Sequence, residues 1–506
     1  MRLAPALAVA ASLAPMAVKA QEEGVLRDWD LGAQLSLGAT VTDNVNREPD
    51  NQAESDLIWR IEPNFSAHRQ GAGLNLDLDY NLQGLIFTRD GGDITLNQQL
   101  LGTANAELLD DRLFLDARST IRQAVVSPQG RISLDNIAQG TNRADVYTLR
   151  LSPYWTSRFG DYAQALARYT FDVAAFEEGA SDSLANAVNL NLNSGSRFQV
   201  LGWSLGYAFS DLSRQDGEDT RRQSLVGQTS YRLNRQWSLL GRAGYENNDS
   251  PNLTTEDGGY GSVGASWQPS RHFAASALYG PDDNEFTVSL NPTTRTALLV
   301  TRRDREVGVS PGERFSGTFR HQSRFGTWSA SYVEETSSVQ ELQFTDTPFL
   351  RFINPLTGEQ IFTDLQGNLI PLDDLLTLTD VEFLRERFEG TFNYERGRSR
   401  FIVRAFSEDR DFERALQPDE SAFGGSAGWI WRFAPKTRSS LRGEWQRSED
   451  DDGREDDLWE TRLGLNHRFA EDLDGSVEYR HGQRDSNQPG DDYTENRLTL
   501  FLRLTF

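Results

Sequence analysis

The sequence predicts an all-β protein, a single large antiparallel transmembrane β-barrel of about 24 strands, with roughly 20 to 26 as the range. Two observations support this fold. Apolar and polar residues alternate along nearly the whole chain. The connections between these segments are short and long in alternation. Because side chains on a strand point to alternate faces, only every second residue of a barrel strand meets lipid. A mean hydropathy of −0.57 is therefore compatible with a membrane protein of this class.

The last stretch of the chain, residues 496–506, shows the alternation most clearly. One face of the predicted strand is apolar and the other mostly polar. The apolar face carries Leu498, Leu500, Leu502, Leu504 and Phe506. The opposite face carries Arg497, Thr499, Phe501, Arg503 and Thr505. A terminal phenylalanine closing such a strand resembles the assembly signal of bacterial outer-membrane β-barrels, so Phe506 is the candidate assembly signal.

The first residues are typical of a secretory signal, which predicts an exported protein. Arg2 precedes an alanine-rich apolar stretch, and Val18-Lys19-Ala20 offers a small-residue cleavage site before Gln21. We expect residues 1–20 to be removed, 21–28 to form a short periplasmic segment and 29–506 to form the barrel. Cleavage removes two basic residues, so the net charge falls from −24 to about −26, which disfavours nucleic-acid binding.

Short turns are expected near 109–112, 158–161, 233–236, 395–398 and 434–437. Longer polar loops are expected at 43–55, 126–144, 211–220, 248–258 and 411–420. Outer-membrane barrels combine short periplasmic turns with long extracellular loops in this way. Aromatic residues such as Trp155, Trp237, Trp267 and Trp328 stand beside the short turns. Their repeated placement indicates an interfacial aromatic girdle.

The face opposite the apolar one is unusually rich in arginine, and we expect these side chains to point into the lumen. The lumen-facing candidates are Arg60, Arg118, Arg150, Arg168, Arg242, Arg320, Arg404, Arg442, Arg462, Arg480 and Arg503. Their companions include Glu62, Asp77, Asp116, Asp172, Glu444, Glu460 and Glu478. One interpretation is mutual neutralisation inside a wet lumen. The alternative is a hydrogen-bonding track for a passing sugar or anionic solute.

We expect no catalytic, cofactor-binding or metal-binding residues. An outer-membrane hydrolase would need a histidine placed with serine or aspartate, but the predicted strands do not bring His68, His272, His321, His467 and His481 together. The acidic stretch Glu449 to Asp457 suggests calcium, yet its spacing matches no defined calcium loop. A solvated, self-repelling loop is the preferred interpretation. Cysteine is absent, so neither disulfides nor thiolate chemistry are expected.

The long connection at 337–382 differs from the other loops because it is apolar. Its apolar residues include Phe349, Leu350, Phe352, Ile353, Leu369, Ile370, Leu375, Leu376, Leu378 and Val381. Pro371 could begin a short helix through Leu372 to Leu376. We expect the loop to fold inward as a constriction or cap. Its apolar residues would cluster together while Asp364, Asp373, Asp374 and Asp380 face lumen arginines. Binding to a partner protein is the rival hypothesis.

The segment Trp29 to Asn44, the run Leu378 to Leu384 and the terminal strand together resemble the uncharacterised outer-membrane proteins associated with PEP-CTERM and exopolysaccharide gene clusters. The resemblance implies a barrel encoded beside sortase-like sorting and polysaccharide-export functions. It implies no established activity and no catalytic residue. The acidic Glu449 to Asp457 stretch departs from the pattern.

Two functional classes follow from these features. The first is a channel for export or passage of exopolysaccharide or a related solute. The second is a non-conducting structural or docking barrel that anchors surface material. The expected partners are outer-membrane lipid and lipopolysaccharide, the barrel-assembly machinery and polysaccharide-export components, with no nucleic acid.

The assembly-signal hypothesis makes the first prediction. Replacing Phe506 with serine removes the apolar terminus and should lower the amount of heat-modifiable barrel in the outer membrane. Gel mobility with and without heating measures this. Wild-type amounts of assembled Phe506→Ser protein would contradict the hypothesis.

Overall fold

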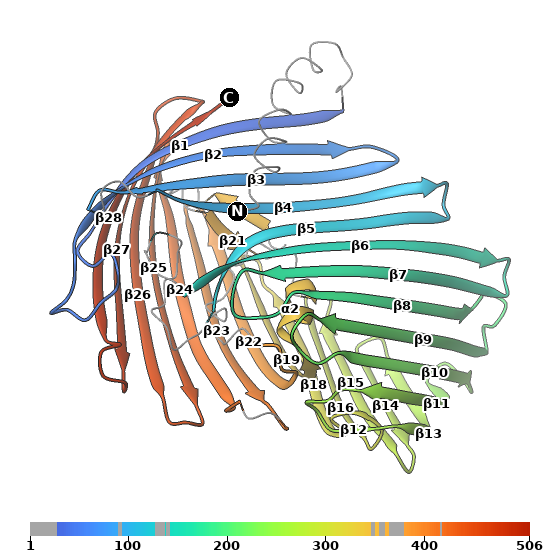
Figure 1. The fold of residues 1–506 in the computed structure, drawn as a ribbon. Coiled ribbons are helices and arrows are strands. Elements are labelled where there is room, and N and C mark those ends of the chain that lie inside the picture. The colour runs from blue at the N-terminus through green and yellow to red at the C-terminus, as the bar shows by residue number, and fades with distance from the viewer. Residues whose placement is uncertain are drawn as a thin grey trace.

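The computed structural model describes residues 28–89, 94–126, 137, 142–345, 350–353, 360–363, 379–414 and 417–506. Within this part of the chain, 24 strands form one antiparallel sheet. The sheet closes because β1 (Trp29–Thr42) pairs with β28 (Tyr493–Thr505), so the first and last strands lie side by side (Figure 1). The predicted fold class and strand number are thus confirmed. The predicted signal sequence lies outside the described residues.

Each strand of the barrel pairs with its neighbours in the chain. The first half of the barrel comprises β1, β2 (Asp56–Gln70), β3 (Leu74–Phe87), β4 (Ile94–Leu109), β5 (Leu113–Val125), β6 (Arg143–Phe159), β7 (Ala163–Phe176), β8 (Ser183–Ser194), β9 (Leu201–Arg214), β10 (Thr220–Arg232), β11 (Trp237–Asp249) and β13 (Gly258–Ser270). The second half comprises β14 (Phe273–Tyr279), β15 (Asp283–Thr293), β16 (Thr296–Arg305), β18 (Gly312–Gln322), β19 (Gly326–Ser337), β22 (Phe383–Arg396), β23 (Ser399–Asp411), β24 (Glu420–Ala434), β25 (Thr437–Asp450), β26 (Glu455–Arg468), β27 (Leu473–Ser486) and β28.

Smaller elements lie in the long connections at one end of the barrel. They are β12 (Thr255–Glu256), which pairs with β17 (Gly308–Val309), then α2 (Val339–Thr345), and β20 (Leu350–Ile353) with β21 (Gln360–Thr363). No helix in the described residues is long and apolar enough to cross a membrane. We call this end the loop end and the opposite end the short-turn end.

The unequal connections confirm the predicted alternation, with two corrections of length. The strands β9 and β10 extend through half of the expected 211–220 loop, leaving residues 215–219 between them. The acidic stretch Glu449 to Asp457 is mostly strand, because Glu449 pairs with Glu455 around a tight turn that contains Gly453 at φ 83°. Backbone pairing does not depend on side-chain polarity, so strands continue beyond the apolar part of the wall.

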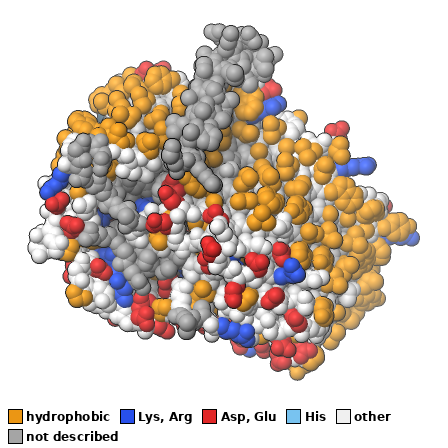
Figure 2. Space-filling model, in the orientation of Figure 1, with side chains coloured by type: hydrophobic (Ala, Val, Ile, Leu, Met, Phe, Trp, Pro, Cys, Tyr) orange, Lys and Arg blue, Asp and Glu red, His pale blue; other side chains and the backbone are white. Residues whose placement is uncertain are grey.

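The outer surface is a belt of exposed apolar side chains, which Figure 2 shows gathered over the wall. Val263 and Leu500 expose 72% and 50% of their surface. At the short-turn end, rings contact one another from strand to strand, as Trp237 does with Trp267. Other contacts of this girdle join Trp267 to Phe273, Trp328 to Phe392, Tyr394 to Phe401 and Phe401 to Trp429. Such a belt and girdle identify a barrel of the bacterial outer membrane.

The inner face is polar along most strands, and its apolar clusters lie at the loop end. One cluster joins Ala124, Val146, Val339, Leu342, Phe383 and Phe412. A second joins Val45, Ile58, Leu85, Phe87 and Ile137. Both combine strand ends with residues of the long connections. In the described residues, these two clusters of buried apolar side chains therefore lie at the loop end, where the connections fold inward, and not at the level of the membrane belt.

Adjacent residues of β8 test which face meets lipid. Leu190 faces outward and Asn191 faces inward, and both are exposed. Leu190→Arg should lower the free energy of unfolding by about 2–4 kcal/mol, because a charge then lies near the middle of the bilayer. Asn191→Arg should change it by about 0.5 kcal/mol or less. Denaturant unfolding in lipid vesicles measures both. Equal losses would contradict this assignment of faces.

Candidate functional site

The candidate site is the lumen, where strand register places every predicted arginine on the inward face. Most of them form ion pairs with carboxylates. The paired arginines are Arg60 with Glu62, Arg150 with Asp172, Arg168 with Asp116, Arg242 with Asp283 and Glu285, Arg404 with Glu389, Arg442 with Glu444, Arg462 and Arg480 with Glu460, and Arg503 with Asp474. Arg320 is exposed, and Arg118 lies directly opposite Arg150.

Arginines form a row across four neighbouring strands, β25 to β28. Cross-strand register aligns Arg442, Arg462, Arg480 and Arg497. Like charges directly opposite each other destabilise a sheet. Here acidic residues two positions along the same strands lie on the same face and accept hydrogen bonds. Arg497 Nη2, for example, lies 2.5 Å from Glu495 Oε1. These carboxylates flank the arginine row, with Glu444, Glu460 and Glu495 on one side and Glu478 on the other, and they neutralise it.

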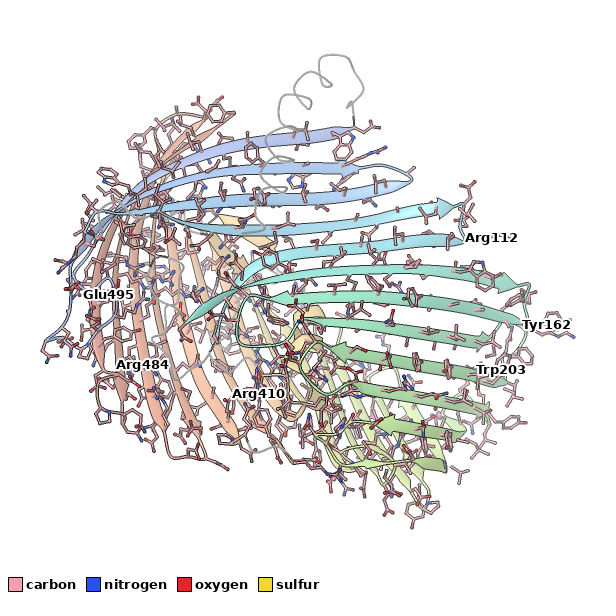
Figure 3. The ribbon with its side chains drawn as sticks, in the orientation of Figure 1. Arg112, Tyr162, Trp203, Arg410, Arg484 and Glu495 are labelled. Carbon is pink, nitrogen blue, oxygen red and sulfur yellow. The ribbon has the colours of Figure 1, made fainter. Side chains whose placement is uncertain are left out.

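Glu408 is a second neutralising centre, on β23. Its side chain is almost fully buried and binds three arginines. Arg385 Nη2 is 2.9 Å from Oε2, Arg410 Nε is 3.0 Å from Oε1, and Arg387 also contacts Oε2. Figure 3 places Arg410, Arg484 and Glu495 toward the loop end of this wall. In the wall from β22 to β28, carboxylates of the same wall thus neutralise these arginines. This arrangement agrees with the neutralisation interpretation.

The wall formed by β8 to β16 is different, because small uncharged side chains line much of it. A pocket of about 360 Å³ lies on its short-turn side. Inward-facing residues of this pocket include Asn193, Ser204, Gln228, Ser230 and Ser276. Its two charged residues, Arg242 and Glu285, neutralise each other in an ion pair of 2.8 Å. Hydroxyl and amide groups both donate and accept hydrogen bonds. This part of the lumen can therefore exchange hydrogen bonds with a hydrated solute without strong charge.

A second pocket of about 420 Å³ lies above it, toward the loop end. Arg222, Arg303, Arg305 and Arg314 line it, with Glu246 as the acidic residue of the lining. The connection 306–311 folds inward and closes one side. Arg305 is fixed there, with Nη1 2.7 Å from Glu246 Oε1 and its guanidinium 3.7 Å from the centre of the Tyr260 ring. We call this cavity the arginine pocket.

The ends of the long 338–382 connection cross the lumen. The helix α2 begins after Ser338, whose Oγ accepts a hydrogen bond from the Glu341 amide at 3.2 Å. The helix contacts β6 and β7, which lie opposite β19 and β22 in the ring of strands. Its Val339 and Leu342 pack with Val146 of β6. The described part of the loop thus narrows the lumen at the loop end, and we call it the cap.

Polar contacts fasten the cap to the wall. Arg222 of β10 pairs with Glu341 and with Glu382. Burial raises the pKa of the Glu382 carboxyl above its ordinary value, and the neighbouring Arg222 guanidinium opposes that rise. Asp380 accepts hydrogen bonds from Ser181 Oγ at 2.5 Å and Gln340 Nε2 at 2.7 Å. The cap is therefore held by ionic, polar and apolar contacts together.

These contacts correct one detail of the loop hypothesis. Asp380 binds a serine and a glutamine where an arginine was expected, and glutamates make the contact with Arg222. Val339, Leu342 and Val381 of the cap pack against residues of the barrel wall. The other apolar side chains of the expected cluster, between residues 349 and 378, lie outside the described residues. Asp364, Asp373, Asp374 and the helix expected at 372–376 lie outside the described residues.

Sequence reasoning missed the arginine pocket. Arg222, Arg303, Arg305 and Arg314 stand near strand ends, where both faces are charged and the alternation fades. Arg302 and Arg303, for example, are neighbours that point to opposite faces. A signal was nevertheless present, because Arg303 and Arg305 keep the two-residue spacing of one face.

The histidines are spread over the barrel. Four bond to a neighbouring strand: His68 to Asp77, His321 to Thr296, His467 to Thr437 and His481 to Asn496. His272 bonds to the Asn291 carbonyl. No group of three or more histidines and acids arranged for a metal ion occurs among the described residues.

No protein-family model and no curated protein sequence matches the chain. Solved structures with a similar arrangement include the siderophore receptor PirA from Pseudomonas aeruginosa, with 9% identity, a TM-score of 0.40, and coverage of 94% of this chain and 80% of that one. The FrpB iron transporter from Neisseria meningitidis has 10% identity and a TM-score of 0.43, and the match covers 96% of this chain and 84% of that one. A loop-deletion mutant of OmpT from Vibrio cholerae has 10% identity and a TM-score of 0.32, and the match covers 95% of this chain and 100% of that one.

The Glu408 centre yields a stability prediction. Glu408→Gln leaves three arginines around a neutral group and should lower the free energy of unfolding by about 3–5 kcal/mol. Glu313→Gln removes the partner of Arg302 in an exposed pair and should have a much smaller effect, since solvent screens that pair. Denaturant unfolding of both variants measures this. Similar losses would contradict a special role for burial at Glu408.

Proposed function

We propose that the barrel is a capped channel for a hydrophilic solute, with exopolysaccharide or a related saccharide as the substrate class. The observation that carries this proposal is the pair of polar pockets on the β8–β16 wall. The arginine pocket lies toward the loop end and the second, mainly hydroxyl- and amide-lined pocket toward the short-turn end, and both are lined by β8 to β11. Together they form a polar path beside the neutralised wall.

The chemistry of this path suits a saccharide. Sugars present many hydroxyl groups, and Asn193, Ser204 and Gln228 offer donors and acceptors at several places. Passage requires contacts that are favourable enough for entry and weak enough for release. Uncharged hydrogen-bonding groups meet this requirement better than a dense set of unpaired charges. The resemblance to exopolysaccharide-cluster proteins agrees with this substrate class.

In this proposal the path is controlled at the loop end and needs no catalytic group. The cap occupies part of the lumen there. The proposed partners are the barrel-assembly machinery, lipopolysaccharide around the belt and polysaccharide-export components on the periplasmic side.

A docking barrel is the second candidate function, and the cap is the observation that favours it. The contacts of α2 with β6 and β7, and of Glu382 with Arg222, tie opposite walls together. A barrel held in this way could anchor surface material without conducting.

Removing the cap distinguishes the two functions. Ser337 and Phe383 are directly opposite in the β19–β22 register, so an Asn-Gly turn can replace residues 338–382 and close a hairpin. The variant should conduct several-fold more than the intact protein in a planar bilayer, because the lumen is wider.

A matched control keeps the cap but cuts elsewhere at the loop end. Arg484 and Tyr493 are directly opposite in the β27–β28 register, so the same Asn-Gly turn can replace residues 485–492, and this change should leave conductance close to that of the intact protein. If the cap-deletion variant assembles correctly but its conductance remains negligible, like that of the intact protein, the docking function is favoured.

A further inference from the structure

Two arginines of the arginine pocket are directly opposite each other on neighbouring strands. Arg303 of β16 pairs in register with Arg314 of β18, and both line the cavity. Directly opposed like charges destabilise a sheet unless a group of opposite charge lies nearby. In the row on β25 to β28, neighbouring carboxylates supply that compensation at close range. The pair in the pocket is arranged differently.

Arg303 shares both of its acidic neighbours with other arginines that lie closer to them. Its Nε lies 3.5 Å from Asp283 Oδ1 and 4.0 Å from Glu285 Oε2, and it donates no hydrogen bond within the described chain. Both carboxylates are engaged more closely by others: Glu285 by Arg242 at 2.8 Å, and Asp283 by Arg305 at 3.0 Å. The side chain of Arg303 is 39% exposed. Its donors are therefore available to a group that enters the cavity.

Arg314 has no carboxylate within ion-pair distance in the described chain. Its Nη2 donates to the backbone carbonyls of Val309 and Ser310, at 2.7 and 2.8 Å. These bonds orient the side chain and hold the inward-folded connection, while the nearest compensating charges, Glu246, Glu334 and Glu413, act on it only from beyond ion-pair distance. Arg222, by contrast, is bound by the cap carboxylates Glu341 and Glu382.

The pocket is built rather than incidental. Arg305 forms one side through Glu246, Asp283 and Tyr260. Gly308 forms another at φ 123°, and a Cβ there would lie 2.9 Å from Glu246 Oε2. Glycine suits this position because L side chains rarely adopt such a positive φ.

We propose that Arg303 and Arg314 bind an oxyanion group carried by the transported solute, such as the carboxylate of an acidic sugar. Guanidinium groups present several donors in a plane that matches a carboxylate. An oxyanion between the two side chains relieves their repulsion and satisfies the donors of Arg303. This inference rests on the proposed function, because the anion is taken to belong to the solute that the channel carries. It narrows the substrate class to acidic saccharides.

The acidic character of the whole protein makes such a site selective. The net charge is −24, so an anion gains nothing from the average field of the molecule. Charges in the lumen water are screened beyond about 8–10 Å at ordinary salt concentrations. Binding therefore depends on the local pair of arginines and should weaken as the salt concentration rises.

Binding is measured by isothermal titration of the intact, detergent-solubilised protein, independently of conductance. The probes are trigalacturonate, the neutral trisaccharide maltotriose and inorganic phosphate. Arg303→Gln should weaken trigalacturonate binding about tenfold or more, because one charge-assisted contact is lost. Arg302→Gln is the matched control, since Arg302 is the adjacent residue, faces outward and pairs with Glu313. It should retain wild-type affinity.

Tighter binding of trigalacturonate than of maltotriose, lost in Arg303→Gln and kept in Arg302→Gln, supports the inference. Equal affinity of the wild type for both trisaccharides, or unchanged affinity of Arg303→Gln, would overturn it. Phosphate binding without trigalacturonate binding would overturn the assignment to a saccharide.

The variant Arg314→Lys keeps the charge and should lose part of the affinity. It provides a second measurement if Arg303→Gln assembles poorly. Conductance of the cap-deletion protein is recorded separately, so failure of the channel proposal is distinguishable from failure of the anion site.

Discussion

Backbone hydrogen bonding is the constraint on which the rest of this structure depends. Within a bilayer no water is available to satisfy an open strand edge, so a sheet must close on itself. Pairing of β1 with β28 provides that closure, and Phe506 continues it by donating a hydrogen bond from its backbone N–H to the Ala33 carbonyl at 2.9 Å. Closure assigns every side chain to lipid or to lumen. The apolar belt and the polar interior follow from that single requirement.

The interior of a barrel this wide cannot be filled by wall side chains alone. Two solutions occur in different parts of the lumen. From β22 to β28, long arginine and glutamate side chains interlock and bury one another, as at Glu408. From β8 to β16, short polar side chains leave space, and the two pockets of the proposed path lie there. This asymmetry concentrates the solute path on one wall.

The loop end joins the two walls. Strands continue beyond the apolar belt, so charged residues occupy both faces and the connections fold over the opening. The cap reaches the opposite wall through Val339 and Leu342, and Arg222 holds it through Glu382. Arg222 also lines the arginine pocket. The entrance and the charged cavity are therefore neighbours that share a residue.

The two-residue alternation in the sequence determined the closed barrel, the strand number and the faces of residues such as Leu500 and Arg480, because strand geometry allows only two directions. Tertiary structure decided which charges meet. Arg480 finds Glu460 across a strand pair, whereas Arg303 opposes Arg314. Such partners depend on register between strands, and a register shift of one residue exchanges every face. The pairing of Asp380 with Ser181 likewise depends on loops meeting across the lumen, which no local pattern encodes.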